Sequence, residues 1–219
     1  MLERTTTIRK PGASREAHVT SQLSENKVNG DDGKTYHAQV NLHTKRGEKK
    51  AGQFFVKDLV EGRRWETTLE QQEQKYLRLK KLGLPVLPTF RIDQEKNSLL
   101  MTNLSNYKIY DNYHHLTSDE REEVKNIDQV SQQVREIAIK AYDNGNGVIL
   151  SYDAYTLIVN DQGHAEIKLV DLGFGSFLLT DGKTSEGLRW TEAEALHEAN
   201  DFVYEIIEGH AGEQNTYFG

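Results

Sequence analysis

The sequence predicts an α+β fold with two lobes: an antiparallel sheet with one helix, then a short, mainly helical second half. Apolar and polar residues alternate over residues 36–43, which is the period of a half-buried strand. Apolar residues recur at spacings of three and four over residues 124–141, which is the period of an amphipathic helix. A third pattern, an apolar strand over residues 166–170, runs directly into Asp171-Leu172-Gly173.

The composition narrows the class of protein. The 219 residues are 36% hydrophobic and 28% charged, the mean hydropathy is −0.72 and the formal net charge is −7. We expect no nucleic-acid partner, because binding to phosphate backbones needs a dense basic surface. We expect no membrane partner, because no apolar run approaches the roughly 18 residues of a membrane span. The N-terminus lacks the apolar core of a secretory signal. The expected compartment is the cytoplasm, or a host cytoplasm for a protein delivered there.

The first half of the chain is predicted to form the sheet. Residues 1–15 are polar and are expected to be a flexible arm. A helix over residues 66–82 ends at Gly83 and Pro85, which are helix-stopping residues. The expected strands cover residues 36–43, 52–60, 88–92 and 98–102, with residues 35–60 and 89–102 in one antiparallel sheet that the helix covers.

The second half is predicted to begin with one long helix. Thr117 and Glu120 have the spacing of a capping box, so the helix is expected to start there and to end before Gly145. A hairpin follows, with strands over residues 157–159 and 166–170. The last helix begins at Thr191, with Glu194 completing its capping box, and ends at Gly209. Residues 210–219 are expected to be a disordered tail.

Three charged residues stand in contexts that suggest a site. Lys57 ends the apolar run Phe54-Phe55-Val56, and a lysine in such a strand needs an anionic partner if it is buried. The alternative is an edge-strand lysine that points to water. Glu73 is the preferred helix partner, because Tyr76 and Leu77 follow it at three and four residues. Glu66 and Glu70 lie on the same expected helix and compete with it.

Lys57, Glu73 and Asp171 occur in the order and contexts of a known family. The chain resembles the protein kinases, whose strand lysine, helix glutamate and Asp-Phe-Gly aspartate hold ATP and magnesium. The resemblance implies a kinase-like N-lobe over residues 16–104 and a truncated C-lobe over residues 105–209. Only 46 residues follow Gly173, which resembles the minimal kinases.

The resemblance also assigns cofactors and binding residues. ATP and Mg²⁺ are the implied cofactors. Lys57 would contact the phosphates and pair with Glu73, and Asp171 would hold the metal. Met101 would lie at the mouth of the adenine pocket. Gly33 matches the first glycine of the loop that covers the phosphates, although Thr35 and Ala38 replace the other two and the segment also suits a hairpin turn.

The catalytic loop departs from the family pattern. Asp153 lies 18 residues before Asp171, the spacing of the catalytic aspartate, but Ile158 then replaces the metal-binding asparagine. Alignment on the hairpin instead places Ser151 and Thr156 at the two positions. Both registers remain open, and so does the interpretation of Asp153 as a structural loop residue.

Two functions follow from these residues. The first is a divergent small kinase that binds ATP with Mg²⁺ and transfers the γ-phosphate to a protein or small-molecule hydroxyl, with Asp153 as the catalytic residue. The second is a pseudokinase, without catalysis, that acts as a protein-interaction module. Lys57, Glu73 and Asp171 favour the first function. The incomplete glycine pattern and the missing asparagine favour the second.

Overall fold

The structure is a computed structural model. It describes residues 2–29, 33–59, 68–110, 116–144, 147–149, 155–170, 172, 178–180 and 191–208. The chain forms two compact units. The first consists of Met1–Ser105 together with Leu172–Gly175, and the second of Asn106–Asp171 together with Ser176–Gly219.

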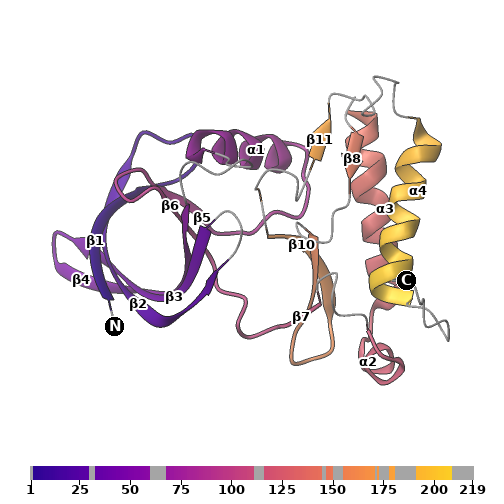
Figure 1. Cartoon of the computed structure of the whole chain (residues 1–219), viewed down its shortest axis with the longest axis horizontal. Helices are drawn as coiled ribbons and strands as arrows, with labels where there is room; N and C mark the ends of the chain where they lie inside the picture. The colour runs from indigo at the N-terminus through magenta and orange to yellow at the C-terminus, as the bar shows by residue number, and fades with distance from the viewer. Residues whose placement is uncertain are drawn as a thin grey trace, which may run out of the picture. The chain divides into compact units, whose positions relative to one another are not determined.

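The first unit contains a closed antiparallel barrel of six strands, in the order β1-β2-β3-β4-β6-β5 (Figure 1). The neighbouring strands β3, β4, β6 and β5 all pair antiparallel, which confirms the single sheet expected from residues 35–60 and 89–102. The barrel strands are β1 (Leu2–Arg9), β2 (Glu16–Asn29), β3 (Gly33–Thr44), β4 (Gly47–Leu59), β5 (Phe90–Asp93) and β6 (Ser98–Thr102).

Strand β1 closes the barrel. It pairs with β2 over eight residues, beginning with Leu2 opposite Leu23, and its last residue, Arg9, also pairs with Ile92 of β5. The prediction of a two-lobed protein kinase-like fold is therefore wrong, because the sheet has a sixth strand and closes into a barrel. Most of residues 1–15, expected to be a flexible arm, form this closing strand.

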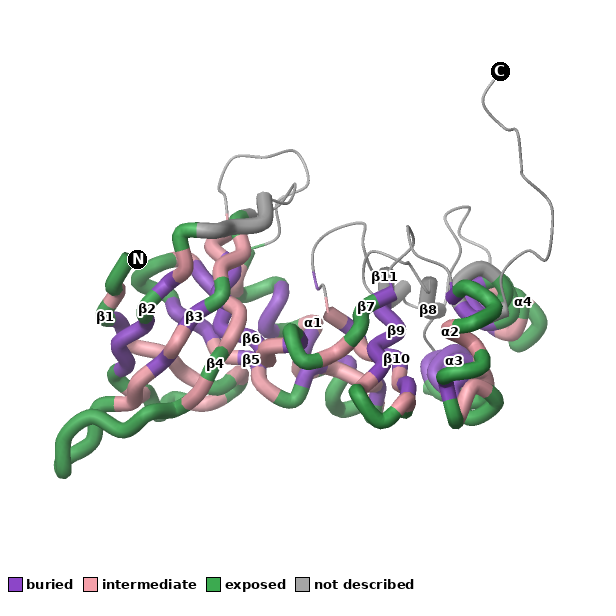
Figure 2. The backbone as a smooth tube through the Cα atoms, turned by 90° about the horizontal axis from the view of Figure 1, so that it is seen from below, coloured by how far each residue is buried: buried purple, intermediate pink, exposed green. Residues whose placement is uncertain are grey.

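The barrel interior is apolar because successive side chains of a strand point to opposite faces. Burial alternates in this way over residues 37–41 of β3 (Figure 2). The alternation predicted for residues 36–43 is confirmed, since its apolar members belong to the interior cluster or pack against it. This cluster consists of Val19, Leu23, Ala38, Val40, Val56 and Leu100, with Ile8, Tyr36, Leu42 and Phe54 packed against it.

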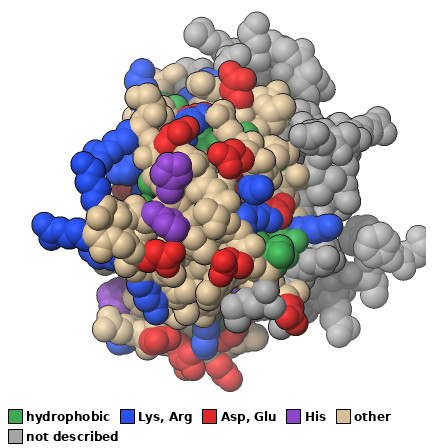
Figure 3. Space-filling model, turned by 90° about the vertical axis from the view of Figure 1, so that its left-hand side faces the viewer, with side chains coloured by type: hydrophobic (Ala, Val, Ile, Leu, Met, Phe, Trp, Pro, Cys, Tyr) green, Lys and Arg blue, Asp and Glu red, His purple; other side chains and the backbone are tan. Residues whose placement is uncertain are grey.

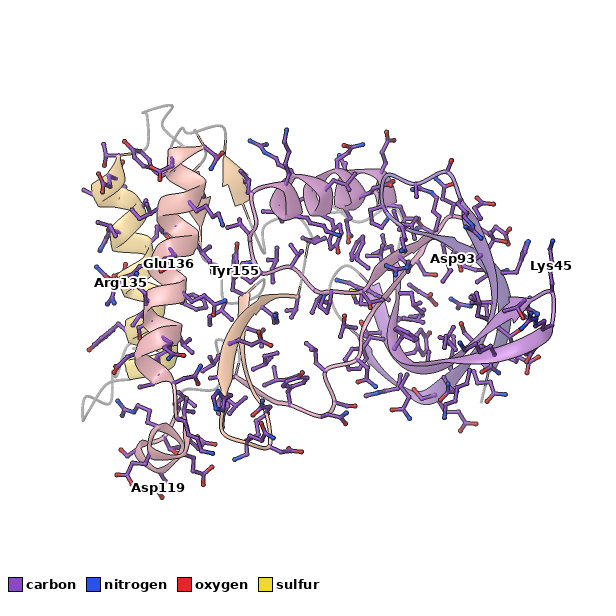
Figure 4. The ribbon with its side chains drawn as sticks, turned by 180° about the vertical axis from the view of Figure 1, so that it is seen from behind. Lys45, Asp93, Asp119, Arg135, Glu136 and Tyr155 are labelled. Atoms are coloured by element: carbon purple, nitrogen blue, oxygen red, sulfur yellow. The ribbon has the colours of Figure 1, made fainter. Side chains whose placement is uncertain are left out.

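One end of the barrel carries charged side chains. Arg4 donates two hydrogen bonds to Asp58, at 2.7 and 2.9 Å. Asp93, labelled in Figure 4, is buried nearby, and burial raises the pKa of its carboxyl group.

The molecular surface seen in Figure 3 is mainly polar and charged, with hydrophobic side chains in small separate patches. On the outside of the barrel, the Thr20 hydroxyl bonds to His43 at 2.7 Å.

Helix α1 (Leu69–Lys81) lies along the outer face of β5 and β6 (Figure 1). It begins at Thr68, whose side chain forms a capping box with Gln71. Tyr76 of α1 stacks on Phe90 of β5 with 4.5 Å between ring centroids, and its hydroxyl donates to the Leu87 carbonyl. The barrel therefore has two apolar faces, one inside and one under α1.

The second unit combines helices with two small sheets. Strands β7 (Lys108–Tyr110), β9 (Tyr155–Val159) and β10 (Ala165–Leu169) form one sheet in the order β10-β9-β7. Strands β8 (Gly147–Ile149) and β11 (Leu178–Thr180) form the other. The helices are α2 (Ser118–Glu123), α3 (Ile127–Asp143) and α4 (Glu192–Phe202), and α4 continues as a π-helix over Val203–Glu208. The capping boxes predicted at Thr117 and Thr191 are confirmed.

The prediction of a single helix after Thr117 is wrong, because the helix is interrupted between α2 and α3. The Asn126 side chain donates to the Ala165 carbonyl and accepts from the Ala165 N–H, both at 2.8 Å. The Lys125 N–H donates to the Gly163 carbonyl at 2.9 Å. Hydrogen bonds to the β9–β10 hairpin thus replace those of a continuous helix.

Helices α3 and α4 lie side by side and share the core of this unit (Figure 1). All five residues of β9 are buried. None of the described helices is both long enough and apolar enough to cross a membrane. The buried helix residues are Val130, Val134, Ile137, Ala138 and Ala141 of α3, and Ala195, Ala199 and Phe202 of α4.

Candidate functional site

Lys57 is a buried lysine in the middle of the barrel wall. It lies on β4 with 9% of its surface exposed, between Thr35 of β3 and Leu99 of β6 in the strand register. Its neighbour Val56 points into the barrel, so alternation places Lys57 on the outer face. The edge-strand alternative does not hold, because β4 is paired on both sides.

Met101 and Gly33 lie on the strands that flank β4. Met101 of β6 pairs with Phe55 of β4 and with Phe90 of β5. It lies two residues along β6 from Leu99, the partner of Lys57, and therefore on the same face of the sheet. Gly33 is the first residue of β3 and pairs with Leu59. The structure therefore brings the candidates Lys57, Met101 and Gly33 onto three neighbouring strands, with an apolar wall beside the lysine.

Glu73 is a buried carboxylate on α1, and the hydrogen bonds described for it come from the last residue of β1 and from the turn that follows β1. Arg9 donates two hydrogen bonds to the two carboxylate oxygens, at 2.5 and 2.7 Å. The Gly12 N–H donates a third, at 2.7 Å. The Arg9 hydrogen bonds lower the pKa of Glu73; burial opposes them and the Gly12 bond adds to them. The pairing of Glu73 with Lys57 stays a prediction.

The competing glutamates have different positions. Glu70 is exposed in the first turn of α1, where a carboxylate interacts favourably with the helix dipole. Glu66 lies outside the described residues. Among the candidates that the structure describes, Glu73 is therefore the buried one.

Sequence reasoning missed Arg9 and Gly12, the partners of Glu73. Gly12 has a φ of +71°, a conformation that glycine adopts without a steric penalty. The pair Pro11-Gly12 is a turn signal, and the β-branched run before it favours a strand. These signals indicate a strand and a turn, but they do not identify the helix carboxylate that the turn contacts.

The segment that contains Asp171 is connected to α1. Asp171 itself lies outside the described residues, but its neighbour Leu172 is 5% exposed. The Lys75 ammonium on α1 donates to the Leu172 carbonyl at 2.9 Å. Leu172 belongs to the same compact unit as the barrel, so the helix that carries Glu73 also holds the residue after Asp171.

Of the catalytic-loop candidates, the structure describes only those that lie in β9. Asp153 and Ser151 lie outside the described residues. Thr156 and Ile158, which take the asparagine position in the two registers, are both buried in β9. Asn160 uses its side-chain oxygen for the β9–β10 turn, where it accepts from the backbone N–H groups of Gln162 and His164. In neither register is the asparagine position of the family pattern occupied by an asparagine.

Among the described residues, no group of three or more histidine, aspartate or glutamate side chains is arranged to hold a metal ion. Mg²⁺ in nucleotide sites needs fewer, because one or two carboxylates bind it together with the phosphates. Asp171, after β10, is the residue that the sequence assigns to this role.

A scan against protein-family models finds no matching family, and a search of curated proteins finds no similar sequence. The residues around β4 and α1 are therefore the basis for proposing a function.

Proposed function

We propose that this chain binds ATP together with Mg²⁺, with Lys57 on the phosphates and Asp171 on the metal. The observation that carries the proposal is the position of Lys57, a buried lysine on the outer face of β4. A lysine ammonium is a compact positive charge of the kind that binds phosphate oxygens. Leu99 and Met101 on the neighbouring strand β6 supply apolar surface for a base.

The position of the residue after Asp171 supports the same site. The hydrogen bond from Lys75 to the Leu172 carbonyl places this residue against α1. Helix α1 packs on the outer face of the barrel through Tyr76 and Phe90. Lys57 is also on the outer face, on the strand β4 that pairs with β6.

Each residue has a distinct role in the proposed site. Lys57 provides a compact positive charge for phosphate oxygens. Asp171 provides a carboxylate oxygen, the ligand type that Mg²⁺ prefers. Bound Mg²⁺ would neutralise charge on the phosphates. Gly33 is the first residue of β3, the strand beside Lys57, and a backbone without a side chain permits close approach of a phosphate.

Binding without transfer is the second candidate function, and a specific observation favours it. Thr156 and Ile158 are buried strand residues, so neither replaces the asparagine that holds the second metal of a kinase. In the transfer hypothesis, Asp153 orients the hydroxyl of a protein or small-molecule acceptor. Without transfer, the bound nucleotide serves to stabilise a protein-interaction module.

The proposal is tested by thermal unfolding with ATP, with and without Mg²⁺. A ligand at one hundred times its Kd stabilises the folded state by about 2.7 kcal/mol, which corresponds to a Tm increase of about 5–10 °C for a chain of this size. We expect this increase in the wild type and its loss in Asp171→Ala. The control Asp161→Ala changes an exposed aspartate in the β9–β10 turn and should keep the increase. An undiminished increase in Asp171→Ala would rule out this metal assignment.

A further inference from the structure

Helix α3 carries an open groove on the side opposite its buried residues. The groove has a volume of about 550 Å³ and is bordered by α4. Its apolar members are Ile139 of α3 and Leu196 of α4, which are both half-buried. The other lining residues of α3 recur at spacings of three and four, which places them in one stripe along the helix. These residues are Gln132, Arg135, Glu136, Lys140 and Asp143.

The charged residues of this stripe have a self-complementary order. Arg135 and Glu136 precede Ile139, and Lys140 and Asp143 follow it. The charges are therefore positive and negative before Ile139, and again positive and negative after it. In the reverse direction along the helix, each pair reads negative and then positive. Two copies of α3 that lie antiparallel, with Ile139 opposite Ile139, consequently bring opposite charges together at all four positions.

Each charge meets its counterpart at nearly the same level of the helix. The pair of Arg135 with Asp143 of a second copy is centred on position 139, and the pair of Glu136 with Lys140 is centred on position 138. One residue separates these centres, which is about 1.5 Å along a helix. The long side chains of arginine and lysine span such a difference. A parallel arrangement would instead place each charge opposite itself, and like charges across an interface are unfavourable.

Two of these charged side chains already form hydrogen bonds beside the groove. Arg135 donates from Nε to the side-chain oxygen of Asn200 at 3.0 Å. Gln132 donates to Glu136 Oε1 at 3.0 Å. Figure 4 labels Arg135 and Glu136 on α3. These bonds do not use the terminal guanidinium nitrogens of Arg135 or the second carboxylate oxygen of Glu136, so both groups can bind a partner with little further loss of side-chain freedom.

We propose that this stripe of α3, together with Leu196, is the interface of a symmetric dimer in which α3 packs antiparallel to α3 of a second copy. Such an interface uses the same patch on both copies, so each ion pair occurs twice. Ile139 lies at the two-fold axis, and the charged residues lie on either side of it. This inference is independent of the proposed nucleotide site, which lies in the other compact unit.

The association should be weak and sensitive to salt. A contact along one helix face is at the low end of interface sizes, below about 1,200 Å², and exposed ion pairs each contribute little. The dimer should therefore form reversibly as the protein concentration rises. Its dissociation constant should increase when the salt concentration rises from about 0.1 M to about 1 M, because the Debye length falls from about 10 Å to about 3 Å.

The test is sedimentation equilibrium of the full chain and of charge variants over a range of protein concentrations. Lys140→Glu and Glu136→Lys each place like charges opposite one another twice in the dimer, so each should raise the dissociation constant by about tenfold. The double variant Glu136→Lys/Lys140→Glu restores opposite charges and should associate as the wild type does. Lys45→Glu is the matched control, because it makes the same change of net charge at an exposed lysine of the β3–β4 hairpin.

A cysteine at the two-fold axis provides a second measurement. The chain contains no cysteine, so Ile139→Cys introduces a single thiol that should form a disulfide between two copies under oxidation. Such a bond requires Cα atoms within about 7 Å. Asp128→Cys, at an exposed position of the same helix, would lie about 30 Å from its copy in this dimer and should form far less of it. Adding Lys140→Glu to Ile139→Cys should reduce the cross-linked fraction.

Each outcome decides the proposal. A concentration-dependent dimer that the two single charge variants weaken, and that the double variant restores, would support it. A wild type that stays monomeric at every concentration would overturn it. A dimer that Lys140→Glu and Glu136→Lys leave unchanged would place the interface elsewhere, and failure of the double variant to restore association would exclude the antiparallel pairing. None of these results affects the proposed binding of ATP.

Discussion

Arg9 and Glu73 form a bidentate ion pair between the end of the closing strand β1 and the helix α1. Its two hydrogen bonds measure 2.5 and 2.7 Å, and both side chains are largely buried. The Gly12 N–H binds the same carboxylate. Glu73 therefore connects three parts of the first unit: the last residue of β1, the turn after it and the helix.

Arg9→Ala should destabilise the protein. The substitution leaves the Glu73 carboxylate without its charged donor, and a hydrogen bond to a charged group contributes about 1.5–3 kcal/mol. We expect the free energy of unfolding to fall by about this amount in urea denaturation. Arg46→Ala is the matched control, because Arg46 is exposed at the tip of the β3–β4 hairpin and should change stability by less than about 0.5 kcal/mol. Equal effects of the two substitutions would contradict this account.

Glu73 should also make stability depend on pH. Its pKa is lowered from 4.5 in the folded state, chiefly by the Arg9 hydrogen bonds. Between the folded and unfolded pKa values the unfolded chain binds more protons, so stability rises with pH there. The contribution of the ionised carboxylate is thus present above about pH 4.5 and is lost as the pH falls through the lowered pKa.

The variant Glu73→Gln removes this titration. We expect the stability difference between wild type and Glu73→Gln to shrink steadily as the pH falls from 5 toward 3. Urea denaturation across that range measures it. A difference that stays constant with pH would mean that the Glu73 charge does not contribute to stability.

Tyr110 should make the stability of the protein depend on pH in the alkaline range. Burial, together with its hydrogen bond to Glu120 at 2.8 Å, raises the pKa of Tyr110 to about 12. The unfolded chain loses this proton near pH 10, so the contribution of Tyr110 is complete below pH 10 and is lost as the pH rises toward 12. Tyr110→Phe should show a weaker loss of stability over this range than the control Tyr107→Phe. Identical pH profiles of the two variants would contradict this assignment.

Gly163 should be intolerant of a side chain for a steric reason. A Cβ atom there would lie 2.5 Å from the Glu123 carbonyl oxygen, and φ is +75°. Gly47 also has a positive φ, +105°, but a Cβ there would meet nothing within 4 Å. Both alanine substitutions introduce backbone strain of about 1 kcal/mol or more, and Gly163→Ala adds a clash. We expect Gly163→Ala to lower Tm clearly more than Gly47→Ala, and the reverse order would contradict the described contact of α2 with the hairpin.

Asp153 provides the test of phosphoryl transfer. If the chain transfers phosphate, Asp153→Asn should reduce transfer from radiolabelled ATP by about two to four orders of magnitude, the contribution of a positioned base. ATP binding should remain. Asp161→Asn is the control in the exposed hairpin turn. Equal transfer by wild type and Asp153→Asn would remove Asp153 from the mechanism, and ATP binding without any transfer by the wild type would favour the second candidate function.

The parts of the fold that the sequence predicted are those with local signals. Alternation identified β3, and helical periodicity identified α3, because these patterns arise within single elements. Thr117 and Thr191 marked two helix starts correctly. The break after α2 was not predicted, because Asn126 fits a helical pattern and its partner Ala165 is 39 positions away.

Barrel closure escaped prediction because it is a long-range property. Strand β1 is rich in threonine and carries Arg4 and Arg9, so its sequence lacks the alternation of apolar and polar residues that marks a half-buried strand. Its pairing with β5 rests on Arg9 opposite Ile92. Nothing in the sequence around residues 1–15 identifies that partner. The protein kinase-like fold was inferred from the order of elements, which does not determine whether a sheet closes.

The candidate site was predictable in part. Lys57 and Met101 were expected near one site, and the strand register places both on the outer face of the barrel. Glu73 was preferred as the helix partner of Lys57, but its described partner Arg9 lies 64 positions earlier and belongs to the strand that was missed. Lys75 has no sequence signal, because a lysine on an amphipathic helix ordinarily points to solvent.

The most direct test of the central claim is a calorimetric titration of the full chain with ATP, in the presence and absence of Mg²⁺. We predict saturable binding of one ATP per chain that requires Mg²⁺ and that is strongly weakened in Lys57→Met, while Lys34→Met, which alters an exposed lysine on the neighbouring strand, binds as the wild type. Absence of binding by the wild type, or equal binding by Lys57→Met, would contradict the claim that the buried Lys57 is part of a nucleotide site.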